Sequence, residues 1–503
     1  MRWSHGVKKL FLVLFVGLVL LSAVLVAKAL QRSPQPRGVS AEAPAGESDR
    51  DGLNETAIAE HLAAALRFRT ISHQDPKEDD HTAFAELRKF LTATYQRVHV
   101  GIAHETIAGD GLLYRWPGTD PSAAPILFLA HQDVVPIEPG TEEKWTHPPF
   151  DGVIADGHVW GRGAIDDKGS LICLFEAFES LLAEGWTPAR TIWLASGFDE
   201  EVGGREGAKK IAEELRARNV RFAWILDEGG AVSRGVVPNV ERPVASIAIS
   251  EKGYLSLELT THATGGHASL PPPETAIGIL AAAIDRLQKN PLPARVTPAF
   301  EKALELLAPE MPFGPRVVLS NLWLTAPLVL YGANDRPETS AMVRTTTAPT
   351  IVQGGVKDNV LPSTARGVIN FRVLPGETIA SVMEYVKKVI ADDRVAITKL
   401  ERSLSEPAPF SSTDRGGYEV LRATLNELFP DAVIVPGVMN GATDSRHFQG
   451  LTPDIYRFLP TTLSKSDLPR IHGTDERASV ADLLTTVRAY RRIIQQGAAA
   501  GPP

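Results

Sequence analysis

Acidic residues and histidines gather in four short clusters of this 503-residue chain, and these side chains are the ones equipped for chemistry. The clusters are His131-Gln132-Asp133, Asp166-Asp167, Asp199-Glu200-Glu201 and Asp227-Glu228. Three of them directly follow apolar stretches typical of buried strands, at residues 126–130, 191–196 and 222–226. Because ligands bind at the carboxyl ends of strands in open α/β sheets, we expect the clusters to converge.

A group of imidazole and carboxylate side chains suits zinc. Cys173 is the only cysteine, which excludes an intramolecular disulfide and a thiolate metal site. Two zinc ions about 3.5–4 Å apart need a bridging carboxylate. Asp133, two residues after His131, has the position of a carboxylate that fixes the histidine tautomer. Glu200 and Glu201 point in different directions as neighbours, so one can bind metal while the other takes a proton.

Each cluster also has a simpler interpretation when it is taken alone. His131 then reads as a loop residue with satisfied hydrogen bonds, and residues 199–201 as a solvated surface. Asp166-Asp167 reads as a charge pair at a helix N-terminus, and Asp227 as the cap of a turn. Four clusters at matching positions in the expected topology favour the metal site instead.

Helices that alternate with strands are expected to position these clusters. Patterns typical of helices at 56–68, 82–95, 171–183 and 206–219 separate the strands, which predicts an α/β fold with a mainly parallel sheet flanked by helices. A β-α-β pattern beginning near Val244 predicts an inserted α+β domain. The expected division is a signal segment at 1–30, a flexible linker at 31–51, a catalytic domain at 52–243 and 376–496, and the insert at 244–375.

Composition and charge exclude several classes of protein. The chain is 44% hydrophobic and 22% charged, which is ordinary for a globular protein and excludes a disordered or fibrous one. Fifty-two basic residues against 60 acidic ones give a net charge of −8, so we expect no nucleic-acid partner.

Two apolar stretches stand outside this pattern. Leu10–Ala27 is uncharged and just long enough to cross a bilayer, which takes about 17–25 residues. It is either a membrane anchor or a signal peptide cleaved near Ala27-Lys28-Ala29, and in both cases the protein is exported to the periplasmic or extracellular side. The remaining alternative is a buried core helix, which the uninterrupted apolar run disfavours. Leu322–Tyr331 either lines a site for an acyl chain or belongs to the core.

The motifs, taken in order, resemble one family of di-zinc metallopeptidases, which includes aminoacylase, carboxypeptidase S, glutamate carboxypeptidase and carnosinase. The resemblance covers residues 52–495 and is strongest with the carboxypeptidase S branch, which also contains secreted N-acyl-amino-acid hydrolase/synthases. The motifs that carry it are 131–136, 145–150, 161–169, 251–253, 265–269, 359–362, 370–376, 441–446 and 471–473. Asp475 departs from the pattern, where Asn is more usual.

The resemblance implies a site with two zinc ions in each subunit, which cobalt or manganese can replace. The implied ligands are Asp166 as the bridge, His131 and Asp227 at one ion, and Glu201 and His472 at the other. Glu200 is then the general base for the attacking water, and Asp133 orients His131. His267, from the lid, stabilises the oxyanion and reaches the neighbouring subunit's site in dimeric relatives, so a homodimer through the insert is expected. Alone, His267 reads as a turn residue.

The resemblance further implies a peptide or small-molecule substrate with a free carboxylate beside the scissile amide. Arg372 suits that carboxylate because its planar guanidinium pairs in a bidentate way, although it also reads as an exposed strand charge. Asn359, Gly441 and Thr443 are expected to add hydrogen bonds. The expected activity is zinc-dependent hydrolysis of the amide to a C-terminal amino acid. The alternatives are a long-chain N-fatty-acyl-amino-acid hydrolase/synthase and an inactive binding homologue; the complete ligand set disfavours the latter.

Overall fold

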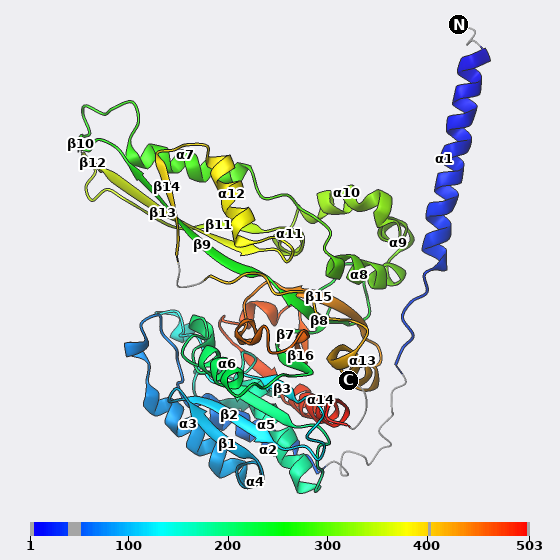
Figure 1. Ribbon diagram of the computed structural model, residues 1–503, viewed down its shortest axis with the longest axis vertical. Coiled ribbons are helices and arrows are strands. Elements are labelled where there is room, and N and C mark those ends of the chain that lie inside the picture. The colour runs from blue at the N-terminus through cyan, green and yellow to red at the C-terminus, as the bar shows by residue number, and fades with distance from the viewer. Residues whose placement is uncertain (1–4, 39–51, 401–403, 500–503) are drawn as a thin grey trace.

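The computed structural model describes residues 5–38, 52–400 and 404–499 of the chain (Figure 1). Residues 39–51 of the expected linker lie outside the described residues, as do residues 1–4 of the expected signal segment. Two separate sheets dominate the fold, and the smaller one is built mainly from the region in which the sequence predicts an insert.

The larger sheet has eight strands and carries the predicted parallel core. Their order across the sheet is β1 (Ala103–Ile107), β2 (Gly111–Trp116), β6 (Ile192–Ser196), β3 (Ile126–Leu129), β7 (Trp224–Arg234), β16 (Ile455–Ser464), β8 (Val244–Glu251) and β15 (Val433–Met439). Strands β6, β3, β7 and β16 run parallel, and so do β8 and β15. This arrangement confirms the expected α/β class.

Helices cover both faces of this sheet because its central strands are apolar on both sides. Along β3, Ile126 and Phe128 face one core, and Leu127 and Leu129 face the other. The first core is completed by α2 (Glu55–Leu66), α5 (Lys168–Ala183) and α14 (Val480–Gly497), and the second by α6 (Ala208–Ala217). The remaining helices of this domain are α3 (His81–Thr94), α4 (Gln96–Gly101) and α13 (Gly416–Leu428).

The smaller sheet is antiparallel and belongs to the inserted domain. Its order is β11 (Thr346–Gly354), β13 (Thr364–Val373), β9 (Gly253–His262) and β14 (Val395–Lys399). Helices α7 (Ala276–Lys289) and α12 (Ile379–Ile390) pack their apolar sides on this sheet. The short strands β10 (Gly266–His267) and β12 (Val360–Leu361) pair at its far end (Figure 1).

Strand pairing differs from the division expected at residues 244 and 375. Strand β8 begins at Val244 but pairs with β15 in the large sheet, and β14 follows residue 375 but pairs with β9 in the small one. The small sheet therefore spans residues 253–399, a limit that local patterns do not reveal because it depends on long-range pairing.

A group of helices between α7 and β11 lies beside the N-terminal helix α1 (His5–Gln31), as Figure 1 shows. These are α8 (Pro298–Leu307), which packs on β15, followed by α9 (Phe313–Leu319), α10 (Leu322–Ala333) and α11 (Pro337–Val343). Helix α10 contains the apolar stretch 322–331. Only Leu322 and Ala333 are buried in α10, so its interpretation as core is wrong.

Candidate metal centre and active site

The clusters that follow β3 and β6 meet the loop before α5 at one edge of the large sheet. One ligand atom each of His131, Asp166 and Glu201 lies within 4.8 Å of the others. A second such group contains His131, Asp167 and Glu228. The convergence expected from strand topology is therefore present, and His131 belongs to both groups.

His131 is buried and oriented by the residue two positions later. Its Nδ1 lies 3.0 Å from the backbone oxygen of Asp133 and 3.3 Å from Oδ1 of the same residue. Its Nε2 faces Asp166 Oδ1 at 3.0 Å. Burial lowers the pKa of His131, but hydrogen bonds to Asp133 and Asp166 outweigh it and hold the pKa well above the ordinary value. The ring thus turns Nε2 toward the carboxylates.

His472 also contacts Asp166, through the second oxygen of its carboxylate. Its Nε2 lies 3.0 Å from Asp166 Oδ2 and 3.1 Å from Glu201 Oε2. These two contacts raise the pKa of His472 to about 10. Asp166 therefore directs one carboxylate oxygen toward each histidine, which is the arrangement of a bridging ligand.

The donor set fits a borderline metal ion. Imidazole nitrogen and carboxylate oxygen are the ligands zinc accepts where cysteine is absent. Within the described part of the chain, Glu201 Oε1 and Asp167 Oδ1 are buried without a hydrogen-bond partner. Buried polar atoms are nearly always satisfied, so these oxygens point to a partner of another kind, such as a cation.

The pair Asp227-Glu228 is arranged differently from the ligand set that the resemblance implies. Asp227 Oδ2 accepts the backbone N–H of Ser445 at 2.7 Å, and its Oδ1 accepts that of Glu228 at 2.9 Å. Glu228 Oε1 lies 3.6 Å from His131 Nε2. The structure thus brings Glu228 into the cluster and places Asp227 against Ser445. The only signal in the sequence was that Glu228 adjoins Asp227.

Glu200 is buried beside the cluster and faces the cleft. Its backbone N–H donates to Asp133 Oδ1 at 3.1 Å, and that of Glu201 donates to Asp133 Oδ2 at 3.0 Å. Burial raises the pKa of Glu200 well above its ordinary value, and the negative charges of Asp444 and Glu201 add to this effect. A carboxylate with a raised pKa is suited to take up a proton near neutral pH.

The cleft lies between the two sheets. The large-sheet domain contributes Glu200, Glu228 and His472, and the small sheet contributes Tyr254 and Arg372. The Arg372 guanidinium lies 4.4 Å from the Tyr254 ring centroid, and burial lowers the pKa of Arg372. Arg372 is therefore a cleft residue rather than an exposed strand charge.

Some residues of the motif at 441–446 line the cleft, and others are buried in the wall behind it. Gly441 lines the cleft, whereas Thr443 is buried and donates its hydroxyl to Glu251 Oε2 at 3.0 Å. Arg446 also lines the cleft, which the sequence interpretation missed although the residue stands within the motif. It adds a second positive charge to the side of the cleft that holds Arg372.

His267 and Asn359 lie together, but not with the metal cluster. The backbone N–H of Ala268 donates to the Asn359 carbonyl at 3.1 Å, and His267 Nδ1 accepts the backbone N–H of Ser269 at 3.1 Å. Both residues are exposed beside the β10–β12 pair, at the end of the small sheet far from the large one (Figure 1). Neither lines the cleft of its own chain.

A buried ion pair connects the loops that carry Asp166 and His472. Arg162 Nη1 lies 2.6 Å from Glu476 Oε2, and Arg162 Nη2 donates to the His472 carbonyl at 3.0 Å. Glu476 Oε1 accepts the backbone N–H groups of Ile165 and Asp166 at 2.8 and 3.1 Å. The ion pair thus fixes the loops that carry the candidate ligands Asp166 and His472. The sequence did not indicate this role for Arg162 and Glu476.

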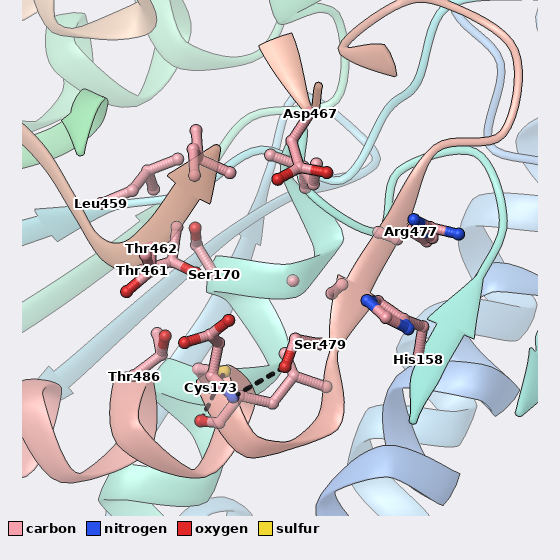
Figure 2. A pocket seen from close by; sticks show the side chains of 17 residues that line it. His158, Ser170, Cys173, Leu459, Thr461, Thr462, Asp467, Arg477, Ser479 and Thr486 are labelled. Atoms are coloured by element: carbon pink, nitrogen blue, oxygen red, sulfur yellow. Dashed lines mark hydrogen bonds between the residues drawn. The ribbon is translucent and has the colours of Figure 1, made fainter. Parts of the chain in front are cut away.

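A second cavity is lined by residues of α5, β16 and α14 (Figure 2). Figure 2 shows Ser170, Asp467, Arg477 and Thr486 around it, with Cys173 at its base. Cys173 is buried and its thiol donates to the Leu483 carbonyl at 3.8 Å, as expected for a core residue. The cavity contains none of the candidate metal ligands and is separate from the cleft.

An α/β sheet with histidines and carboxylates at its carboxyl edge, covered by an inserted domain, defines a metal-dependent hydrolase class. Residues 127–496 match the family described as peptidase family M20/M25/M40, and the chain belongs to this family. It is therefore an enzyme of the peptidase and amidohydrolase type, as the resemblance predicted, and acts on peptides or amino-acid derivatives.

Two curated relatives show which branch the chain resembles. It is 40% identical over 447 residues to the probable carboxypeptidase S-like 2 of Dictyostelium discoideum, covering 88% of this chain and 85% of the relative. It is also 40% identical over 479 residues to the human N-fatty-acyl-amino acid synthase/hydrolase PM20D1, covering 94% of each. The expected similarity to the carboxypeptidase S branch is confirmed.

Solved structures share the fold. An M20 family metallo-carboxypeptidase from Sulfolobus solfataricus matches with a TM-score of 0.64 at 17% identity, covering 87% of this chain and 98% of that one. Human carnosine dipeptidase 1 matches with a TM-score of 0.62 at 13% identity, covering 89% and 97%. At these identities the likeness is one of fold alone.

Proposed function

We propose that the protein hydrolyses the amide bond between an acyl or aminoacyl group and a C-terminal amino acid, using two zinc ions. The observation that carries this proposal is the placement of Asp166 between two histidines beside the buried Glu200. His131 and Glu228, with Asp227 as the alternative, would hold one ion, and Glu201 and His472 the other. Asp166 would bridge them.

In the proposed reaction, the metal activates the carbonyl and the water, and Glu200 transfers the proton. Bound zinc polarises a carbonyl and lowers the pKa of water to about 7. The Glu200 carboxylate accepts a proton from the attacking water and later delivers it to the leaving amine. Its raised pKa suits both transfers, since the same group must hold the proton between them.

Positive charge in the cleft supports the proposal that the substrate has a free carboxylate. Arg372 and Arg446 both line the cleft, and the planar Arg372 side chain pairs with a carboxylate in a bidentate way. The Gly441 backbone also borders this region and is available for a hydrogen bond. Thr443 supports the wall through Glu251 rather than touching substrate.

The acyl group distinguishes two versions of this activity. A carboxypeptidase would accept an aminoacyl or peptidyl group, as the name of the carboxypeptidase S-like relative implies. A long-chain N-fatty-acyl-amino-acid hydrolase/synthase is the second candidate. It is supported by the 39% and 40% identity to mouse and human relatives of that name over 94% or more of both chains.

The exposed histidine of the insert requires a second subunit if it acts in catalysis. His267 and Asn359 lie away from the cleft of their own chain. We propose that in a homodimer formed through the insert they reach the partner's cleft, where His267 stabilises the oxyanion. We also propose that the protein is exported and remains anchored through α1, which is apolar and long enough to cross a membrane.

The experiment that tests this function measures release of free amino acid by the full-length, zinc-loaded protein. Dipeptides and N-acyl amino acids with acyl chains of two to about 18 carbons are compared, with Glu200→Gln as the inactive variant. Glu213→Gln, on the exposed side of α6, is the matched control. Release that Glu200→Gln abolishes supports the mechanism, and the preferred acyl group selects the version. Equal release by Glu200→Gln would overturn the role of Glu200.

A further inference from the structure

We infer that α9 and α10 form a hairpin that enters one leaflet of the membrane that α1 crosses, so that the inserted domain is attached to the bilayer at a second place. The hairpin comprises residues 313–333. This inference does not depend on the reaction that the cleft catalyses.

The hairpin exposes large apolar side chains that the described part of the chain leaves uncovered. Phe313, Trp323, Leu328 and Tyr331 are exposed by 58%, 60%, 60% and 72%. Helix α10 contains no charged residue over all of its twelve positions. Soluble proteins rarely expose contiguous apolar patches of this kind, and those that do use them for binding.

The one charge in the hairpin is directed into α1 rather than outward. Arg316, in α9, donates Nε–H to the Ala29 carbonyl at 2.9 Å and Nη2–H to the Arg32 carbonyl. Carbonyls at the end of a helix lack intrahelical partners and carry partial negative charge, so the guanidinium caps the C-terminus of α1. The charge is thereby satisfied where the two elements meet.

Two polar side chains at the bend of the hairpin, Asn321 and Thr325, donate hydrogen bonds within the protein, whereas the buried Ser320 hydroxyl there has no partner among the described residues. Asn321 Nδ2 donates to the carbonyls of Leu25 in α1 and Val317 in α9, at 3.0 and 2.8 Å. The Thr325 hydroxyl donates to the Val318 carbonyl at 2.6 Å. Internal satisfaction of polar groups is the condition for placing a non-helical bend in hydrocarbon.

The hairpin is too short and too sharply bent to cross a bilayer. The chain bends by 113° between its two helices. At about 1.5 Å per residue, the twelve residues of α10 extend roughly 18 Å, against a hydrocarbon thickness of about 30 Å. An element of this length lies in one leaflet.

Contact with α1 identifies the bilayer as the occupant of this surface. The span Lys9–Gln31 is bilayer-length and apolar, and only its C-terminal end touches the body, where Ala29 is buried. The Lys28 ammonium lies 5.4 Å from the Trp323 ring centroid, a pairing typical of the membrane–water interface. The exposed hairpin therefore continues the lipid-facing surface of α1, and Figure 1 shows the two side by side.

The segment after α1 fixes this geometry to the catalytic domain. Gln35 pairs through both side-chain polar atoms with the backbone of Ile434 in β15, at 2.9 and 3.1 Å. Arg32 forms an ion pair with Glu305 of α8 at 3.1 Å. The end of α1 is thus held beside the hairpin, so that both meet the same bilayer surface.

Fluorescent labels on the full-length protein in phosphatidylcholine vesicles test this inference. Leu328→Cys is labelled with a polarity-sensitive dye, since the native Cys173 is buried and does not compete. Leu14→Cys, in the exposed middle of α1, is the lipid-embedded control, and Glu213→Cys on α6 is the water-exposed control. A second label at Tyr331→Cys replaces Leu328→Cys if that variant does not fold.

The expected result is a blue-shifted emission at residue 328 that a spin label near the lipid headgroups quenches more than twofold. Iodide in the water quenches only the label at residue 213. Quenching at 328 by iodide alone would overturn the inference. So would protection from both quenchers that increases with the ratio of protein to lipid, because a second copy of the chain would then cover the hairpin.

Discussion

Asp133 Oδ1 accepts the backbone N–H of Glu200 at 3.1 Å, so the residue that orients the candidate metal ligand His131 also fixes the proposed base. The same oxygen lies 3.3 Å from His131 Nδ1, and Oδ2 accepts the N–H of Glu201 and the hydroxyl of Ser72. One buried carboxylate thus sets the distance between the strand end at His131 and the turn at Glu200-Glu201.

Replacement of Asp133 by Asn tests this relationship. The amide presents an N–H group toward one of two backbone donors or toward His131, so one contact becomes repulsive. We expect zinc affinity to fall about 10–100-fold, as is typical when a group that orients a metal ligand is lost. Competition with a fluorescent chelator measures the affinity, and kcat/KM is expected to fall with it.

Ser72→Ala is the matched control for that variant, because it removes one donor to Asp133 and leaves the carboxylate in place. Its zinc affinity is expected to stay within a few-fold of that of the unchanged protein. If Asp133→Asn behaved like Ser72→Ala, Asp133 would not position the site.

A pair of variants decides between Asp227 and Glu228 as metal ligand. Glu228 faces His131, whereas Asp227 is occupied by backbone N–H groups, so Glu228→Gln is expected to lower the bound zinc from two ions to about one. Asp227→Asn is expected to keep two ions and to lose stability instead. Elemental analysis of dialysed protein measures the metal, and the reverse result would restore the assignment that the resemblance implies.

The core of the fold and most of the site were accessible from the sequence because both follow local periodicity. Helix α5 repeats apolar residues at 171, 174, 175 and 178, and β3 is uniformly apolar, so the position of His131 after a buried strand is a local property. The pairing of β14 with β9 depends on residues more than 100 positions apart, which no local pattern encodes.

Which of Asp227 and Glu228 faces the metal cluster could not be predicted from the sequence either, because this also depends on long-range strand pairing. Strand β7 continues to Arg234 instead of ending near residue 226, and a bulged register with β16 sets which side chain faces the cluster. The exposure of α10 was equally hidden, since an apolar stretch has the same composition whether it packs in a core or meets lipid.

The buried pair Arg162–Glu476 is expected to control both stability and metal binding. Arg162→Met leaves the Glu476 carboxylate buried without its cation, which typically costs about 3–5 kcal/mol of unfolding free energy. Loss of the Arg162 contact to the His472 carbonyl is also expected to weaken zinc binding. Chemical denaturation and zinc titration measure the two effects.

The pair Arg394–Asp392 at the surface of the insert provides the comparison, because surface ion pairs contribute little to stability. Arg394→Met is therefore expected to leave zinc affinity unchanged. A similar loss of stability in both variants would show that burial of the Arg162–Glu476 pair has no special effect.

Complementation between two inactive variants tests whether His267 acts in the partner's cleft. Glu200→Gln and His267→Ala are each expected to have little activity alone. In a mixed dimer, one cleft contains both the intact Glu200 and the partner subunit's His267. Co-expressed chains are expected to regain about a quarter of the full activity, because half of the dimers are mixed and each has one complete site. No recovery in verified mixed dimers would show that His267 does not act in the partner's cleft.

The buried Lys252 makes stability depend on alkaline pH. Burial lowers its pKa to about 8, and the nearby charge of Arg372 contributes, while its ammonium donates to the Arg344 carbonyl at 2.8 Å. An unfolded lysine has a pKa of about 10.4. Between pH 8 and 10 the unfolded chain therefore binds more protons at this residue than the folded chain. The contribution of Lys252 to the free energy of unfolding consequently rises with pH through this window.

Lys252→Met is expected to remove up to about 3 kcal/mol of that rise, at about 1.4 kcal/mol for each pH unit between the two pKa values. Lys168, whose pKa burial lowers to about 7, keeps its own contribution in both proteins. Denaturation at pH 8, 9 and 10 with a chelator present measures the slopes without a contribution from metal. The window stops at pH 10 because buried tyrosines such as Tyr114, whose pKa is raised by burial, oppose the trend above it. Equal slopes for the two proteins would show that folding does not lower the pKa of Lys252.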